Sequence, residues 1–148
     1  MTEFWQLTFP MPGQSENTAR RVEQAGWDGL YFADTQCLSG DIYSAMCLAA
    51  KATTHLKIGT AVTNPVTRHP AVTASAIATV QVESAGRAVL GIGRGDSSLG
   101  YLGQKPASAT TLRPVRSWPR TLCANWPLAR TSFSLTSARQ SYVASKTP

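Results

Sequence analysis

Short apolar runs alternate with segments of helical spacing along residues 4–106 of the chain. The apolar runs cover residues 4–9, 30–33, 58–62 and 88–93. Residues 30–33 contain no polar position, and a run without polar alternation predicts a strand that is covered on both faces, as in a parallel sheet. The pattern therefore predicts buried strands joined by crossover segments.

Residue types that begin helices stand at the start of the segments between these runs. The predicted helices cover residues 16–25, 42–53 and 71–84. Ser15 and Asp41 are candidate N-caps, because their short side chains can accept a hydrogen bond from the first helical turn. Pro70 fits the first position of the third helix, where its missing N–H would have no partner. About four strand-and-helix units are therefore expected.

A repeat of this kind fits two architectures, an open doubly wound sheet and a closed (β/α)8 barrel. A dinucleotide-binding sheet needs Gly-x-Gly-x-x-Gly after its first strand, whereas Gly91 and Gly93 follow the fourth strand and Asp96 stands where the last glycine belongs. We therefore expect an α/β fold that forms the N-terminal half of a TIM-like (β/α)8 barrel.

Polar residues follow three of the predicted strands. Asp34 follows the second, residues 61–64 the third and residues 93–97 the fourth. In a barrel the carboxyl ends of the strands open onto one rim, so these residues are predicted to line one pocket. Glycines at 93 and 95 would let the backbone approach a flat ligand, and Asp96 and Ser97 could hydrogen-bond its polar edge. The alternative interpretation of residues 93–97 is a tight strand-to-helix turn capped by Asp96.

Length and composition narrow the class of protein. With 148 residues, 43% of them hydrophobic, the chain can form one core. It has no run of eighteen apolar residues, so no membrane span is expected. It also has no basic start followed by an apolar segment, so no signal peptide is expected, and the expected location is cytoplasmic. Cys37, Cys47 and Cys123 form no Cys-x-x-Cys pair, which predicts free thiols and no metal site.

The basic excess lies entirely in residues 107–148. Residues 1–106 hold eight basic and eight acidic side chains, whereas residues 107–148 hold six basic side chains and no acidic one. Arginines beside Trp118 and Trp126 are the ingredients of a nucleic-acid-binding tail. These arginines are scattered among prolines rather than clustered, so no nucleic-acid partner is expected. The chain is predicted to comprise a barrel domain, residues 1–106, and a basic, low-order tail, residues 107–148.

Three segments of the barrel domain resemble the luciferase-like monooxygenase superfamily. They are Leu30-Tyr31-Phe32-Ala33-Asp34, residues 56–70 and residues 86–97. The resemblance is greatest to the branch that uses the deazaflavin coenzyme F-420, typified by methylenetetrahydromethanopterin reductase. The motifs that carry it are Thr-Asn-Pro and Arg-His-Pro within residues 63–70 and Gly-Arg-Gly-Asp-Ser at residues 93–97. The resemblance covers about residues 4–106.

The resemblance implies an oxidoreductase that transfers hydride between coenzyme F-420 and a small organic substrate, often as a homodimer. The cofactor ring would lie at the carboxyl ends of the strands, beside a non-proline cis peptide bond at Ala61-Val62. The expected cofactor-binding residues are Thr60, Ala61, Val62, Asn64, Gly93, Gly95, Asp96 and Ser97. An FMN-dependent monooxygenase of the same superfamily and a non-catalytic flavin-binding paralogue are the alternatives.

Asp34 is the candidate catalytic acid or base. Many members of the superfamily carry Asp-His here, whereas Asp34 is followed by Thr35, so a histidine proton donor is missing. The alternative interpretation of Asp34 is a carboxylate that caps a helix or orders a loop.

The resemblance ends near Pro106, where the mixed charge pattern also ends. Members of the superfamily continue through a second half-barrel, which binds the phosphate side of the cofactor. We therefore expect the chain to be a truncated, inactive form in which residues 107–148 are read out of frame after an insertion or deletion in the gene.

Overall fold

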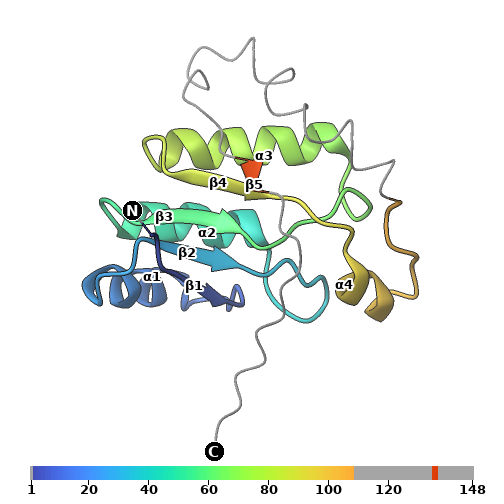
Figure 1. Ribbon diagram of the computed structural model, residues 1–148, viewed down its shortest axis with the longest axis horizontal. Helices are drawn as coiled ribbons and strands as arrows, with labels where there is room; N and C mark the ends of the chain where they lie inside the picture. The colour runs from blue at the N-terminus through green and yellow to red at the C-terminus, as the bar shows by residue number, and fades with distance from the viewer. Residues whose placement is uncertain (1, 109–134, 137–148) are drawn as a thin grey trace, which may run out of the picture.

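The computed structural model describes residues 2–108 and 135–136, and within them strands alternate with helices (Figure 1). The strands are β1 (Trp5–Thr8), β2 (Gly29–Phe32), β3 (Lys57–Thr60), β4 (Ala88–Gly91) and β5 (Leu135–Thr136). The helices are α1 (Ser15–Gln24), α2 (Ile42–Ala52), α3 (Pro70–Glu83) and α4 (Asp96–Tyr101).

The described strands form one parallel sheet in the order β1-β2-β3-β4-β5. Leu30 pairs with Ile58, and Ile58 pairs with Ala88. The arrowheads of β2, β3 and β4 point toward the side of the molecule that carries α4 (Figure 1). Parallel neighbours joined by helices are the repeat of a TIM-like barrel, so the predicted partial barrel is confirmed.

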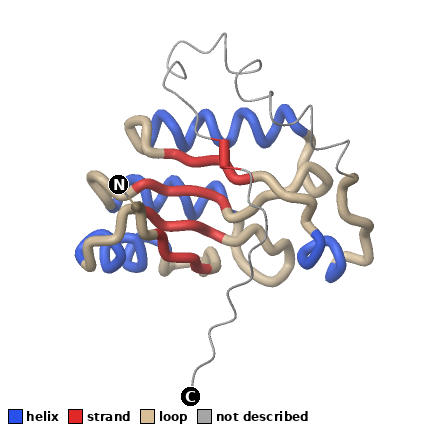
Figure 2. The backbone as a smooth tube through the Cα atoms, viewed as in Figure 1, coloured by secondary structure: helices blue, strands red, loops and turns tan. Residues whose placement is uncertain are grey.

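One face of the sheet packs against α1, α2 and α3, and this layer holds the core (Figure 2). The alternation of side chains along each strand sends the largest apolar residues to this face. The core residues contributed by strands and helices include Leu30, Phe32, Ile58, Leu90, Val22, Met46, Ala49 and Ile77.

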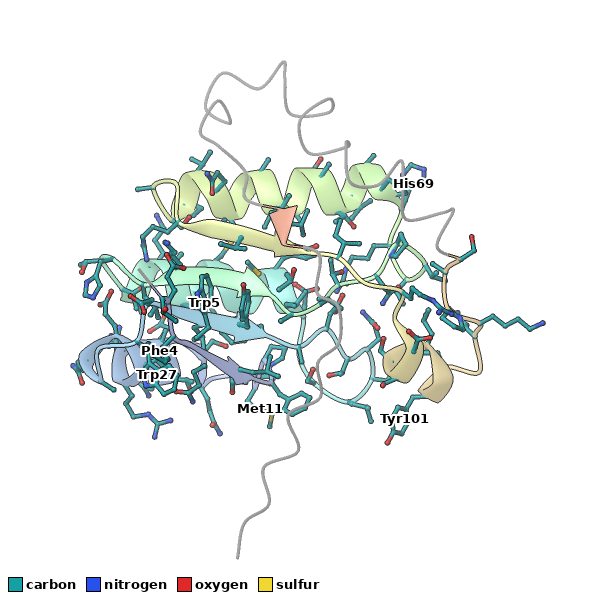
Figure 3. The ribbon with its side chains drawn as sticks, viewed as in Figure 1. Phe4, Trp5, Met11, Trp27, His69 and Tyr101 are labelled. Carbon is teal, nitrogen blue, oxygen red and sulfur yellow. The ribbon has the colours of Figure 1, made fainter. Side chains whose placement is uncertain are left out.

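The opposite face of the sheet carries a stacked aromatic pair. The ring centroids of Trp5 and Tyr31 are 4.2 Å apart, and Figure 3 shows Trp5 among the side chains of this region. A Cβ atom on Gly29 would lie 2.2 Å from the Trp5 ring, and one on Gly59 would lie 2.7 Å from the Tyr31 ring. Glycine at both positions therefore gives the aromatic rings their space. Leu7, on the same face, remains 58% exposed.

Local signals place the helix starts well, with one difference. Asp41 caps α2 as predicted, its Oδ1 accepting a hydrogen bond from Ser44 N at 2.8 Å. Pro70 occupies the start of α3, and the N-cap there is His69, whose Nδ1 accepts from Ala71 N at 3.2 Å. Ser15 is the first residue of α1 rather than its N-cap.

The third and fourth strands are shorter than the apolar runs that predicted them. β3 ends at Thr60 instead of residue 62, and β4 ends at Gly91 instead of residue 93. Beyond these ends Thr63 and Ile92 form an isolated bridge. Of the predicted tail, only residues 107, 108, 135 and 136 lie among the described residues. No described helix is long and apolar enough to cross a membrane.

Candidate functional site

Two loops at the carboxyl ends of β3 and β4 lie against each other. We call residues 61–68 the elbow and residues 93–97 the glycine loop. Thr63 N donates to Gly91 O at 3.0 Å, and Gly93 N donates to Thr63 O at 2.9 Å. The structure therefore brings together the two segments that the sequence assigned to one rim.

The glycines of the loop allow this close contact. A Cβ atom on Gly93 would lie 2.5 Å from Val62 Cγ2, and one on Gly95 would lie 2.8 Å from Asn64 Cβ. Gly95 also has φ +80°, which side-chain-bearing residues rarely adopt. The elbow occupies the space that side chains at these two positions would need. The glycines therefore allow the two loops to pack together, in addition to any close approach of a ligand.

Thr60 to Val62 form the junction between β3 and the elbow. The Thr60 hydroxyl is buried, donates to Gly91 O at 2.8 Å and accepts from Gly91 N at 2.9 Å. It therefore holds β3 to β4. The Ala61-Val62 peptide bond is cis, and both residues are partly exposed at the rim.

Asp96 and Ser97 are exposed at the start of α4. The N-cap of α4 is Gly95, so Asp96 does not cap this helix but is its first residue. An Asp96 carboxylate oxygen is 3.4 Å from Arg94 Nη2. Both side chains are accessible for contact with a ligand.

Asp34 is 5% exposed and its carboxylate is surrounded by donors. Oδ1 accepts from Gln36 Nε2 at 2.7 Å. Oδ2 accepts from Thr63 Oγ1 at 2.7 Å and from Arg68 Nη1 at 2.6 Å. Within the described residues, the predicted catalytic group therefore orders the neighbouring loop.

Arg68 is a site residue that sequence reasoning missed. Its Nη2 donates to Asp41 Oδ2 at 3.0 Å, and its guanidinium lies 5.3 Å from the centroid of the Tyr43 ring. Burial opposes ionisation of Arg68, but the hydrogen bonds to Asp34 and Asp41, together with the nearby negative charge, outweigh it and raise the pKa of Arg68. Burial likewise opposes ionisation of Asp41, but hydrogen bonds from Ser44 and Arg68 hold the pKa of Asp41 below its usual value.

Asn64 links the elbow to the glycine loop through a buried amide. Its Oδ1 accepts from Val66 N and Thr67 N, both at 3.0 Å. Its Nδ2 is buried and has no hydrogen-bond partner among the described residues. An unpaired buried donor is uncommon in native proteins and is often explained by an absent water or ligand.

The described part of the site offers packing and hydrogen bonds rather than a free acid or base. Arg68 is shared between the Asp34 and Asp41 carboxylates, and no group of three metal-ligating side chains occurs among residues 2–108 and 135–136. Such a site suits a cofactor that brings its own reactive atoms, while the protein binds and orients it.

Comparison with known proteins gives the family and its coverage. The family model described as "Luciferase-like monooxygenase" matches residues 10–103. The 5,10-methylenetetrahydromethanopterin reductase of Methanolobus tindarius is 38% identical over 96 residues, which are 62% of this chain and 29% of the relative. The reductase of the same name from Archaeoglobus fulgidus is 39% identical over 95 residues, which are 28% of that relative's length. The chain thus spans less than a third of the length of these two relatives.

A solved relative agrees with this placement. The coenzyme F-420-dependent tetrahydromethanopterin reductase of Methanopyrus kandleri superposes with a TM-score of 0.70 at 28% identity, covering 78% of this chain and 38% of that one. A Baeyer-Villiger monooxygenase component of Pseudomonas putida, solved in complex with FMN, has a TM-score of 0.59 at 18% identity, which supports the fold alone. Because the family model covers well over half of the residues and the sheet has the same partial-barrel topology, the chain belongs to the luciferase-like monooxygenase family.

Proposed function

We propose that this chain carries the cofactor-ring side of an oxidoreductase that transfers hydride between coenzyme F-420 and a small organic substrate. The ring would lie on the elbow and the glycine loop. Bound there, the deazaflavin would supply the hydride chemistry. The whole enzyme would act in the cytoplasm as a homodimer, and residues 1–148 alone would be inactive, because the second half-barrel is needed for the phosphate side of the cofactor.

The buried Asn64 amide is the observation that carries this proposal. Its Oδ1 is held by the backbone of the elbow, so its orientation is fixed, and its Nδ2 donor lacks an acceptor among the described residues. A carbonyl on the polar edge of a flat ring fits this donor. The exposed Asp96 and Ser97 supply further polar groups beside it.

The relatives favour the deazaflavin over a flavin. The curated relatives at 38–39% identity are reductases, and the solved reductase is described as coenzyme F-420-dependent. The FMN-bound monooxygenase is less similar, at 18% identity. An FMN-dependent monooxygenase is the second candidate, and a flavin-binding paralogue without activity is the third.

Ligand titration separates these candidates. In a chimera, residues 1–106 of this chain would replace the matching part of the M. kandleri reductase. Coenzyme F-420 should quench the chimera's fluorescence at micromolar concentration, and FMN should not. Tight binding of FMN alone would contradict the deazaflavin assignment. Binding of F-420 without hydride transfer to any tetrahydromethanopterin-type substrate would favour the inert paralogue.

Two substitutions test the site residues in the same chimera. Asn64→Ala and Asp96→Ala should each weaken F-420 binding by about 1–3 kcal/mol if they donate to or accept from the buried ring. Asn17→Ala, on the exposed surface of α1, is the matched control and should leave the affinity unchanged. Unchanged affinity in the Asn64 and Asp96 variants, with native thermal melting, would remove both residues from the site.

A further inference from the structure

Two residues of the elbow, Thr63 and Arg68, are attached to one carboxylate oxygen. Asp34 Oδ2 accepts from the hydroxyl of Thr63, at the start of the polar part of the elbow, at 2.7 Å. The same oxygen accepts from Arg68 Nη1, at the end of the elbow, at 2.6 Å. Thr63 and Arg68 are 29 and 34 residues away from Asp34 along the chain. A single atom just beyond β2 therefore joins an early residue of the elbow to its last residue.

Arg68 extends this attachment to the start of α2. Its second nitrogen donates to Asp41 Oδ2 at 3.0 Å, and the Asp41 Oδ1 atom caps the helix through Ser44 N. The Arg68 and Asp34 side chains are 17% and 3% exposed. Charged side chains that are buried to this degree need partners of opposite charge. The planar guanidinium of arginine can bind two carboxylates at once, which a lysine ammonium does less well. We call Asp34, Asp41 and Arg68 the carboxylate clamp.

The middle of the elbow is held from inside by Asn64. Its Oδ1 accepts from two successive backbone amides, Val66 N and Thr67 N. The first residues of the elbow are also held by backbone bonds, from Ala61 N to Phe32 O at 2.9 Å and from Thr63 N to Gly91 O at 3.0 Å. The clamp adds side-chain attachments that reach the far end of the elbow at Arg68. Asn64 lies between these attachments and packs against Gly95.

We propose that Asp34 and Arg68 are positioning residues, which hold the elbow in the geometry that presents Asn64 and the glycine loop to a cofactor ring. This inference rests on the proposed function for the ring, but the clamp itself can be measured without a cofactor. Asp34 accepts hydrogen bonds on both carboxylate oxygens, from Gln36, Thr63 and Arg68. We assign these bonds to orienting the elbow.

Hydrogen exchange of the 148-residue chain, followed by mass spectrometry, tests the clamp. The amides of Thr63, Val66 and Thr67 are protected by named hydrogen bonds. In Asp34→Asn and Arg68→Met, peptides from residues 61–68 should exchange at least about tenfold faster, while peptides from β2 and β3 keep their rates within about twofold. Arg68→Lys should give an intermediate rate, because one ammonium can hold only part of the clamp.

Asp28→Asn is the matched control. Asp28 also accepts a backbone hydrogen bond, from Phe4 N at 2.8 Å, but it lies away from the elbow. Its variant should leave the exchange of residues 61–68 unchanged. Equal elbow exchange in the Asp34 and Asp28 variants would overturn the proposal. Faster exchange across all strands in Asp34→Asn would also overturn it, because the residue would then support the whole fold and not the elbow.

The same variants separate the clamp from the proposed function. If Asp34→Asn loosens the elbow of the 148-residue chain while the chimera binds no F-420, the clamp is upheld and the cofactor assignment is removed. If the chimera binds F-420 and Asp34→Asn changes neither its affinity nor the elbow exchange, the cofactor site is upheld and the clamp is overturned.

Discussion

At the scale of single residues, the Tyr43 hydroxyl stands out because it is buried without a hydrogen-bond partner among the described residues. Burial raises the pKa of Tyr43 to about 12, from an ordinary value near 10. The fold therefore favours the neutral phenol. Its contribution to stability is complete below about pH 10 and is lost as the pH rises from 10 to 12.

This shift predicts alkaline unfolding that depends on one hydroxyl. Tyr43→Phe cannot ionise, so its unfolding midpoint, followed by circular dichroism, should lie at a higher pH than that of the wild type. Absorbance at 295 nm should show one fewer late-titrating tyrosine. At neutral pH the variant should be as stable or slightly more stable, because it removes an unpaired polar atom. Identical alkaline midpoints would show that Tyr43 ionises without cost.

Residue types and local spacing predict what chemistry a side chain can perform better than they predict which residues it will contact. The sequence named Asp34, Asn64 and the glycines at 93 and 95 correctly as neighbours at one rim, because parallel strands end at the same edge. It did not reveal Arg68, whose partners Asp34 and Asp41 lie 34 and 27 residues away. No spacing rule connects residues so far apart, so the clamp became visible only in three dimensions.

At the scale of elements, local signals predicted the starts of two helices. Asp41 caps α2 and Pro70 is the first residue of α3, whereas Ser15 lies inside α1 instead of capping it. The turn between α2 and β3 is different. Three of its backbone amides, from Thr54, His55 and Leu56, donate to Glu23 Oε1 on α1 at 2.8–2.9 Å.

The same carboxylate also lies beside the His55 side chain. The Nδ1 atom of His55 is 3.2 Å from Glu23 Oε1. Its side chain is nevertheless 71% exposed, as expected for a surface turn. The carboxylate belongs to another helix, which is why no local pattern announced it.

Glu23 predicts a pH-dependent link between α1 and this turn. Burial opposes its ionisation, but the backbone donors of His55, Leu56 and Thr54 outweigh it and lower the pKa of Glu23. Its contribution is therefore present above the unfolded value of about 4.3 and is lost as the pH falls through the folded value. Glu23→Gln should reduce the free energy of unfolding by about 1–3 kcal/mol at pH 7, measured by urea denaturation.

A matched variant on the same helix checks this assignment. Glu16 forms only an exposed i,i+4 ion pair with Arg20, at 3.4 Å. Glu16→Gln should therefore change the free energy of unfolding by less than about 0.5 kcal/mol. The difference between the two variants should shrink as the pH falls through the lowered folded pKa of Glu23. Equal effects of the two substitutions at pH 7 would mean that the turn does not depend on Glu23.

At the scale of the whole molecule, the face of the sheet opposite the helices is exposed at its β1 edge. Leu7 on this face is 58% exposed, beside the stacked Trp5 and Tyr31, whereas Val89 farther along the same face is buried. In a closed barrel this face would turn inward and be filled by side chains from other strands. The described residues contribute five parallel strands, whereas such a barrel has eight.

The composition of residues 107–148 leads to a prediction about the gene. Acidic residues are absent from this segment, while the preceding 106 residues balance eight acidic against eight basic side chains. A barrel helix would mix both charge signs and show a 3.6-residue apolar stripe, and prolines at 114 and 119 would remove backbone donors from it. The family match stops at nearly the same place, at residue 103.

Translation of the encoding DNA after codon 106 in the other two forward frames tests an out-of-frame origin of residues 107–148. We expect one frame to reveal about two hundred residues of alternating strand and helix pattern, as a whole barrel of about 250 residues requires. Stop codons or patternless sequence in both frames would contradict this origin.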